Sequence, residues 1–226
     1  MPLIKDVENL ALSDAISLWL KGKDEWNRWV KSNPCYNISF KGVSFAEHLS
    51  SGEVCSFVGY QFPDGSVDFS GADFGDGDVS FAGTNFGNGS VYFRNTQFKN
   101  GKVDFSRAYF GSSMPKSVIL FDDANFGDGD VSFVGTTFGD GYVGFSGAGF
   151  ADGVVDFTKS RFGKGIVRFV EAKFINADVY FDEVNFGGEE VNFSKAIFGG
   201  KEFYFKSVES LELKLYFTWC DFGDCK

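Results

Sequence analysis

Apolar and polar positions along this chain repeat with a period of 12 residues from Ile38 onward. In the stretch from Val67 to Asp78, valine, a polar residue and phenylalanine open the unit. A second phenylalanine follows five residues after the first, and a turn of Gly and Asp closes the unit. Residues two apart in a strand point the same way, so each phenylalanine and the residue two positions before it face one interior. The pattern predicts very short strands, joined by tight turns and stacked in successive layers.

Phenylalanine fills one structural slot repeatedly. Of the 30 phenylalanines, only Phe203 lies outside the two repeated positions, and it takes the valine slot. The slot before the first phenylalanine mostly holds valine or isoleucine, whereas the slot before the second mostly holds alanine, threonine or serine. Large residues beside small ones let facing layers interdigitate without voids. The predicted structural core includes Val67, Phe69, Ala72, Phe74, Phe81, Phe86, Phe133 and Phe138.

The spacing between phenylalanines alternates between five and seven residues, so we expect two units to form one coil around four inward rings. This predicts an all-β solenoid with about 24 residues per coil. Insertions break the register around residues 48–52 and 112–116. Insertions in a solenoid form surface loops, which often carry specificity. Ser112, Met114 and Lys116 in the second loop are therefore candidate interaction residues.

Two parts are predicted along the chain, an N-terminal helical cap over 1–34 and the repeat domain over 35–226. Apolar residues at near-helical spacing predict helical structure within 7–20. A second helix is predicted over 24–31, with Asp24 as its N-cap.

The predicted helices have two alternative roles. The first coil of a solenoid needs an apolar cover, and an amphipathic helix with Trp26 and Trp29 on one face suits that role. The same face also suits a helix that binds a partner, and the sequence leaves this alternative open. Pro34 is predicted to end the helical part.

The net charge of −10 argues against direct binding of nucleic acid, which requires a basic surface. The chain contains neither a run of about 18 apolar residues nor a signal-peptide pattern at its start, so we expect a cytoplasmic protein and no membrane partner. Without an export signal, reduced thiols are expected rather than disulfides or a zinc site. The four cysteines are Cys35, Cys55, Cys220 and Cys225.

Catalytic chemistry finds little support in the sequence. His48 is the only histidine, so no nucleophile and base pair can be assigned and no enzyme is expected. Adjacent acids occur at 122–123, 182–183 and 189–190. If these lie in strands, they point to opposite sides and form a solvated surface rather than acid/base pairs.

The Gly-Asp turns at 75–78 and 127–130 resemble the turns of calcium-binding solenoids. Asp and Asn also suit tight turns because they bond to their own main chain. Lys164 occupies an equivalent position, where its charge would repel a cation. We therefore favour turn chemistry, and expect no cofactor and no metal, while calcium remains the alternative.

The repeats resemble those of the pentapeptide-repeat protein family. Val67-Asp68-Phe69-Ser70-Gly71 and Ala72-Asp73-Phe74-Gly75-Asp76 look like two five-residue units, followed by the additional residues Gly77 and Asp78. The resemblance implies a right-handed quadrilateral β-helix, here in a variant with 12-residue double units. Several members of the family are acidic rods that imitate DNA on type II topoisomerases.

These observations favour a non-catalytic protein-interaction scaffold, with the topoisomerase-binding DNA mimic as its most specific form. The charged residues of this chain come in bands of opposite sign along the sequence, whereas a DNA mimic should carry one sign of charge along its length. The alternative is an assembly role through a homodimer of the C-terminal coil, since an exposed last strand needs a cover. Further candidate interaction residues are Asp68, Asp73, Asp76, Asp122, Asp123, Leu211 and Leu213.

Overall fold

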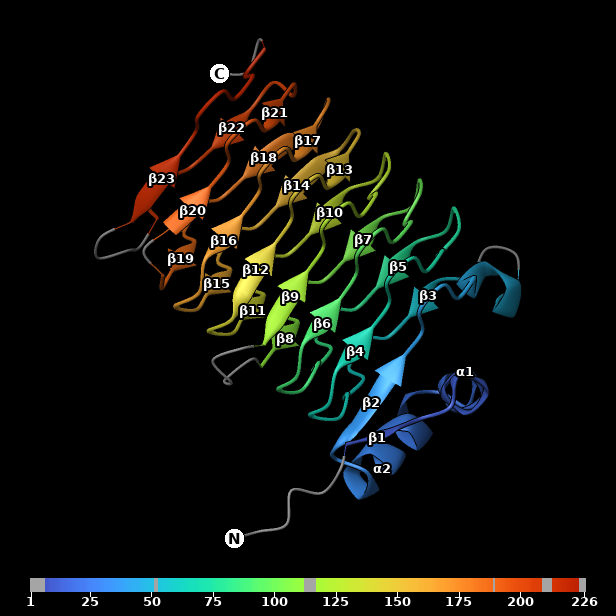
Figure 1. The fold of residues 1–226 in the computed structure, drawn as a ribbon. Helices are drawn as coiled ribbons and strands as arrows, with labels where there is room; N and C mark the ends of the chain where they lie inside the picture. Colours follow the sequence, from blue (N-terminus) through green and yellow to red (C-terminus); the bar gives the residue numbers. More distant parts are fainter. Residues whose placement is uncertain (1–6, 51–52, 112–116, 189, 209–212, 224–226) are drawn as a thin grey trace, which may run out of the picture.

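A computed structural model describes residues 7–50, 53–111, 117–188, 190–208 and 213–223. The chain winds into stacked coils whose short strands form four parallel sheets, and two helices precede the coils (Figure 1). The four sheets correspond to four sides of the coil, so the predicted quadrilateral solenoid with an N-terminal helical segment is confirmed. None of the helices in the described ranges is long and apolar enough to span a bilayer.

The largest sheet, here called the nine-stranded face, is crossed once in each coil. Its order is β1 (Glu8–Asn9), β2 (Tyr36–Ser39), β4 (Val67–Asp68), β6 (Val91–Tyr92), β9 (Val118–Leu120), β12 (Tyr142–Gly144), β16 (Val167–Arg168), β20 (Glu190–Asn192) and β23 (Lys214–Tyr216).

The seven-stranded face lies across the core from it. Its order is β22 (Phe203–Tyr204), β18 (Asp178–Tyr180), β14 (Val154–Asp156), β10 (Val131–Ser132), β7 (Val103–Asp104), β5 (Val79–Ser80) and β3 (Cys55–Ser56).

The two remaining sides are narrower and pass into isolated bridges toward the N-terminal end. One contains β19 (Asn185–Phe186), β15 (Arg161–Phe162), β11 (Thr137–Phe138) and β8 (Tyr109–Phe110). The other contains β13 (Gly149–Phe150), β17 (Lys173–Phe174) and β21 (Ile197–Phe198).

Strand register confirms the predicted coil. Val131 pairs with Val155, a step of 24 residues. The step from Ile38 to Val67 is 29, and that from Val91 to Ile119 is 28, so the two insertions are accommodated without loss of pairing. The short 3-10 helix η1 (Phe45–His48) leads into the first insertion.

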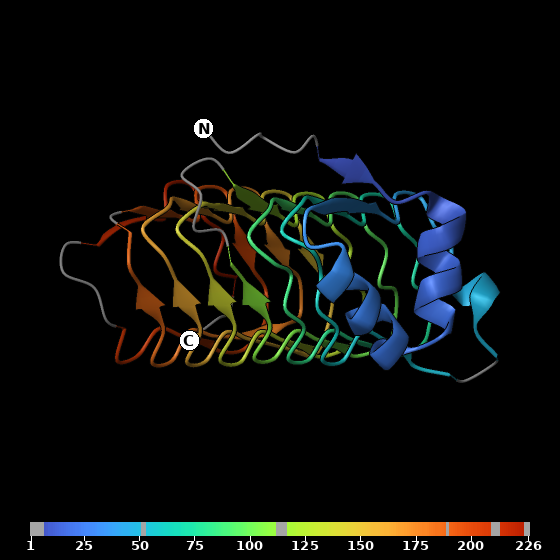
Figure 2. The ribbon, with the colours of Figure 1, turned by 90° about the horizontal axis from the view of Figure 1, so that it is seen from below.

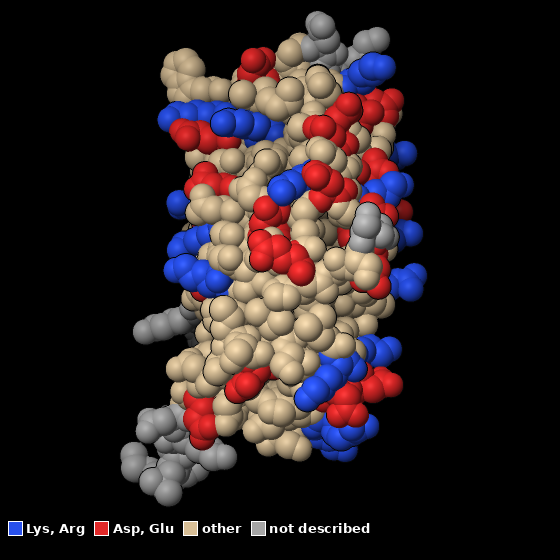
Figure 3. Space-filling view, turned by 90° about the vertical axis from the view of Figure 1, so that its right-hand side faces the viewer, with Lys and Arg blue, Asp and Glu red and all other residues tan. Residues whose placement is uncertain are grey.

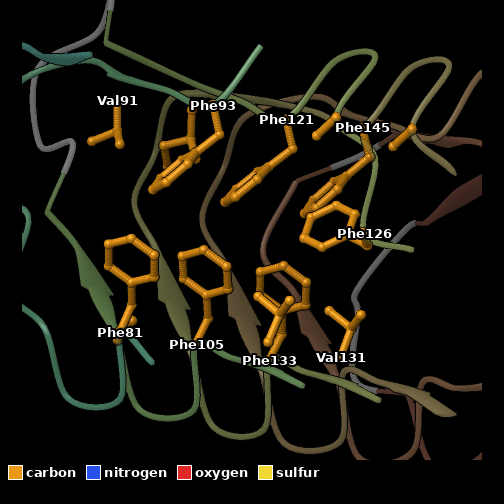
Figure 4. Close-up of a cluster of buried hydrophobic side chains, with 14 of the residues drawn as sticks. Phe81, Val91, Phe93, Phe105, Phe121, Phe126, Val131, Phe133 and Phe145 are labelled. Carbon is orange, nitrogen blue, oxygen red and sulfur yellow. The ribbon is translucent and has the colours of Figure 1, made fainter. Parts of the chain in front are cut away.

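Phenylalanine rings fill the interior in two ways. Rings in successive coils stack nearly parallel, as Phe69 does on Phe93 with centroids 4.9 Å apart. Rings from facing sheets meet edge to face, as Phe93 does with Phe105 at 5.4 Å (Figure 4). Both are favourable aromatic geometries, worth about 0.5–1.5 kcal/mol per pair beyond the burial of area. The same contacts recur from coil to coil, so the core is continuous along the rod.

The small inward slot carries hydroxyl groups whose bonds tie one coil to the previous one. Threonine Oγ1 donates to the carbonyl oxygen of a phenylalanine, from Thr84 to Phe57 (2.6 Å), from Thr96 to Phe69 (2.9 Å) and from Thr136 to Phe105 (2.6 Å). Ser160 occupies the same slot one coil after Thr136, but its buried Oγ has no hydrogen-bond partner in the described part of the chain. This hydroxyl is therefore buried without compensation.

Two helices, α1 (Leu12–Leu20) and α2 (Lys23–Ser32), lie at one end of the stacked coils (Figure 2). The indole ring of Trp19 stacks on Phe57, with ring centroids 5.6 Å apart. The Trp26 ring packs against Phe40 with centroids 6.0 Å apart, and its Nε1–H donates to the carbonyl oxygen of Gln61 at 2.7 Å. The helices therefore cover the aromatic interior of the first coil.

The boundaries of the helical segment differ from the sequence expectation in two places. The first helix begins at Leu12, because Glu8 and Asn9 instead extend the nine-stranded face by pairing with β2. Asp24 lies in the first turn of α2, whereas Gly22 is the N-cap, with φ of 89°. A positive φ costs glycine little, so the chain reverses sharply between the helices at this residue.

Candidate protein interface

The outward positions of the nine-stranded face vary from coil to coil, unlike the inward positions. Successive coils place there Asp68, Tyr92, Leu120, Gly144, Arg168, Asn192 and Tyr216. The short strands hold each of these residues in fixed register with its neighbours. This face therefore presents a non-repeating chemical pattern on a regular backbone.

Tyr142 lies in the middle of this face, next to Gly144 and Arg168. Its ring lies beside Gly144, where a Cβ atom would come within 2.9 Å of the ring and 2.5 Å of Asp122 Oδ1. Leu120 is only 3 % exposed although it occupies an outward slot. The guanidinium carbon of Arg168 lies 5.9 Å from the centroid of the Tyr142 ring, a cation–π distance. We call Leu120, Asp122, Tyr142, Gly144 and Arg168 the Tyr142 cluster.

Asp122 is the half-buried carboxylate of this cluster. Burial raises its pKa, while the backbone N–H of Ser146 and the charge of Arg94 act in the opposite direction. The Ser146 N–H donates to Asp122 Oδ1 at 2.9 Å, and Arg94 Nε lies 3.9 Å from Oδ2. The side chain is therefore held between two coils, and its orientation is fixed from both.

An open groove of about 540 Å³ adjoins the N-terminal part of the same face. Its lining includes Lys41, Asp68, Tyr92 and Arg94, so both signs of charge and an aromatic ring meet there. Asp68 also accepts a hydrogen bond from the Ser70 backbone N–H at 2.8 Å. Such a mixed lining suits a polar and aromatic protein surface better than a uniformly charged ligand.

The turn aspartates bond to the main chain of neighbouring turns. Asp78 Oδ1 accepts from the backbone N–H of Lys102 at 2.9 Å, and Asp140 Oδ1 accepts from that of Lys164 at 3.1 Å. These bonds support the turn-chemistry interpretation. Among the described residues, no group of three or more His, Cys, Asp and Glu side chains could hold a metal ion.

The charge bands of the sequence become ion pairs between successive coils. Examples are Lys99 with Asp73 at 3.0 Å, Lys102 with Asp130 at 3.2 Å and Lys195 with Glu171 at 2.9 Å. Water screens all of these exposed pairs, so each contributes little to stability. On the side shown in Figure 3, acidic and basic side chains lie next to one another in groups, and uncharged surface separates these groups. This side has no continuous acidic stripe.

The remaining predicted interaction residues are spread over the rod. Asp76 is exposed in its turn and accepts a hydrogen bond from Asn100 Nδ2 at 3.1 Å. Asp123 is exposed beside the Tyr142 cluster, and Leu213 is half-buried against the end of the core. Ser112, Met114, Lys116 and Leu211 lie outside the described residues.

The eight predicted core residues are all buried, none being more than 3 % exposed. Sequence reasoning named Asp122 but missed the other four residues of the Tyr142 cluster, because the outward slot looked merely variable. The sequence did contain one indication of this cluster, which is the glycine at position 144, where the equivalent positions of the neighbouring coils have a larger side chain.

The acids at 122–123 and 182–183 lie in turns and not in strands, so the argument from strand alternation was wrong. Asp123 has φ of 56°, and this left-handed turn separates the environments of the neighbouring carboxylates. Asp122 is half-buried, whereas Asp123 is exposed.

His48 lies in a groove of about 340 Å³ beside the cap, whose lining also includes Glu53, Ser56 and Tyr60. The sequence did not predict this grouping. Free thiols are found at the three described cysteines, Cys35, Cys55 and Cys220, whereas Cys225 lies outside the described residues.

No protein-family model matches the sequence, and no curated protein matches it. Among solved structures, the chain aligns with HetL, a pentapeptide repeat protein involved in heterocyst differentiation regulation from the cyanobacterium Nostoc sp. strain PCC 7120. The alignment covers 96 % of this chain and 94 % of HetL, at 13 % identity and a TM-score of 0.18. Independently of that alignment, the repeated phenylalanine pairs and the four parallel-stranded sides fit the pentapeptide-repeat architecture.

Proposed function

We propose that this protein is a non-catalytic, rigid scaffold that binds another protein through its nine-stranded face. The observation that carries the proposal is the Tyr142 cluster with its adjoining groove. Together they place tyrosine, arginine and aspartate side chains at fixed outward positions on this face.

Rigidity supports this role. Each coil is joined to the next by main-chain hydrogen bonds and by stacked rings, and the hydroxyls of Thr84, Thr96 and Thr136 add further bonds between coils. A surface that is already ordered loses little conformational entropy when it binds, so modest contacts suffice for affinity.

Residue type supports the choice of face. Tyrosine and arginine are enriched in protein interfaces, where each contributes a large contact area together with directional hydrogen bonds. Arg94 is exposed beside the groove, and Tyr92 is half-buried in its wall. A partner that inserts a polar or aromatic side chain into the groove would contact both.

The test is an affinity pull-down with the intact chain, followed by binding measurements on the captured protein. Tyr92→Ala should weaken binding of that protein about tenfold or more, because a hot-spot anchor typically contributes about 2 kcal/mol or more and a tenfold change needs only about 1.4 kcal/mol. Tyr180→Ala is the matched control, since Tyr180 is a half-buried outward tyrosine on the seven-stranded face. Equal loss of binding in both variants, or none in Tyr92→Ala, would refute the proposed site.

DNA mimicry on a type II topoisomerase is the second candidate function. The net charge of −10 supports it, since an acidic rod can occupy a basic DNA-binding surface. The ion pairs between coils count against it, because they neutralise acids that a mimic would present.

A gyrase supercoiling assay tests this second candidate. The protein should inhibit supercoiling or protect the enzyme from poisons, and replacing Asp76, Asp128 and Asp152 with Asn should weaken the effect. These exposed acids lie on one turn column. No effect of the wild-type protein on gyrase would remove DNA mimicry while leaving the scaffold proposal intact.

A further inference from the structure

The side of the solenoid formed by β8, β11, β15 and β19 is locally basic, although the chain as a whole carries a net charge of −10. The charged residues at its outward strand positions, and at the turn positions two residues earlier, are Arg107, Lys159, Arg161 and Glu183. The equivalent positions of the seven-stranded face hold Lys102 together with Asp78, Asp104, Asp130, Asp156, Asp178 and Glu202. An anionic partner is therefore attracted to one side and repelled by the next.

Strand register lines these residues up along the rod. Tyr109 pairs with Thr137, and Thr137 pairs with Arg161, so the three occupy one column in successive coils. The Cγ atom of Arg107 lies 3.7 Å from the position that a Cβ atom would take at Gly135, in the next coil. The stem of Arg107 therefore extends over this glycine, toward the coil that holds Arg161.

The two arginines have unused hydrogen-bonding capacity. Both are exposed, and neither forms an ion pair with a described residue. Lys159 Nζ lies 3.8 Å from Glu183 Oε2, and both side chains are largely exposed, so water weakens this pair. A guanidinium presents its N–H donors in a planar fork that binds a carboxylate through two parallel bonds. Carboxylates are therefore the groups that this surface suits best.

An open groove of about 580 Å³ gives a ligand access to Arg161. Its lining includes Lys159, Arg161, Glu183, Asn185 and Ser207. Toward the N-terminal end of the same side, Tyr109 is 44 % exposed and adds an aromatic surface. We call Arg107, Tyr109, Thr137, Lys159 and Arg161 the basic patch.

We infer that the basic patch binds an extended acidic segment of another protein. A polyproline II segment advances about 3.1 Å per residue and returns a side chain to the same side at every third position, after about 9.3 Å. Two coils of the solenoid span about 9.6 Å, twice the distance between neighbouring strands. Carboxylates three positions apart therefore match the two-coil separation of Arg107 and Arg161.

A duplex nucleic acid fits this side less well than a single peptide segment. Asp104 and Asp156 lie on the adjoining seven-stranded face, three residues before Arg107 and Lys159. A wide polyanion would contact these acids, whereas an extended peptide needs only about the width of one strand, 4.8 Å. The patch lies on a different side from the Tyr142 cluster, so it adds a second binding surface to the proposed scaffold and does not depend on the first.

Fluorescence anisotropy of a labelled peptide with glutamate at every third position tests the inference on the full chain. The peptide should bind the wild-type protein, and binding should weaken as the salt concentration rises. The same peptide with glutamine in place of glutamate should bind at least tenfold more weakly. Arg161→Glu should raise the dissociation constant at least tenfold, and Arg107→Glu should act in the same direction. Both side chains are exposed, and circular dichroism checks that the variants fold.

Lys173→Glu is the matched control. Lys173 is exposed and occupies the equivalent strand position one 12-residue unit after Arg161, on the three-stranded side. This variant makes the same change in net charge and should leave peptide binding unchanged. Equal weakening by Lys173→Glu and Arg161→Glu would show a general effect of charge and would overturn the inference, as would a wild-type protein that does not bind the peptide.

Two further measurements identify the site and the class of ligand. Tyr92→Ala should leave peptide binding unchanged, and loss of the peptide in this variant would place it on the nine-stranded face and refute the basic patch. A duplex DNA oligonucleotide should not displace the peptide, and efficient displacement would overturn the choice of a protein segment. Loss of partner capture in Tyr92→Ala with peptide binding retained would show that the two binding surfaces act separately.

Discussion

Thr136 and Ser160 provide a sharp test of how hydroxyl groups act inside this core. They occupy the same inward slot in adjacent coils, and both are fully buried. Thr136 Oγ1 donates to the Phe105 carbonyl oxygen at 2.6 Å, whereas Ser160 Oγ is left without a partner. Removing each hydroxyl should therefore change stability in opposite directions.

Thr136→Val keeps the shape of the side chain and removes its hydrogen bond. The expected loss in the free energy of unfolding is about 1 kcal/mol, the usual net value of one hydrogen bond. The Phe105 carbonyl oxygen still accepts from the Ala108 backbone N–H at 3.0 Å, so a larger penalty for an orphaned acceptor is not expected. Ser160→Ala removes a buried, unpaired hydroxyl and should stabilise the protein by about 1 kcal/mol.

Urea unfolding followed by far-ultraviolet circular dichroism measures both changes against the wild-type protein. For a chain of this size, the corresponding thermal shifts are about 2–4 °C downward for Thr136→Val and upward for Ser160→Ala. The reasoning is refuted if Ser160→Ala destabilises the protein as much as Thr136→Val does. That result would mean that the Ser160 hydroxyl forms a bond in solution.

Three further predictions concern the core, the cap and the turns. Phe105→Ala, in the middle of the stack, should cost about 3–5 kcal/mol in urea unfolding. Phe222→Ala at the exposed end should cost clearly less, and equal losses would contradict the stacked-core description. Burial raises the pKa of Tyr60 to about 12, so its stabilising contribution should be complete below pH ~10 and lost as pH rises toward ~12. Tyr60→Phe should remove this part of the alkaline destabilisation in unfolding curves at pH 9 and 11.5, and an identical pH dependence in the variant would count against it. Adding EDTA should leave the thermal midpoint unchanged because turn aspartates bond to backbone amides, and a fall in the midpoint would instead support calcium binding.

The sequence predicted the inward half of this protein well because the inward positions repeat. Phe69, Phe93 and their equivalents occupy a slot whose spacing is set by the coil, so period and register followed from counting residues. The insertion lengths also appear directly as register steps of 29 and 28.

The outward half could not be predicted in the same way. The side chains of Leu120 and Tyr142 both lie next to Gly144, and these two residues, 22 positions apart, meet there only because the chain has completed a coil. Strand β1 was missed for a related reason, since Glu8 and Asn9 pair with β2 through the backbone and leave no apolar pattern. Contacts that depend on which residues become neighbours in space leave no local period in the sequence.

The 24-residue register restricts how such a chain can change length in evolution. Duplication of one whole coil would lengthen the rod by about 4.8 Å, the distance between strands, and would keep every later residue on its own side. Duplication of a single 12-residue unit would preserve the phenylalanine pattern equally well. It would, however, move every later residue to the opposite side, so that Arg168 would leave the face that holds Tyr142. Half-coil duplications are therefore neutral for folding yet would disrupt the proposed binding surface, and lineages that retain this surface should differ in length by whole coils.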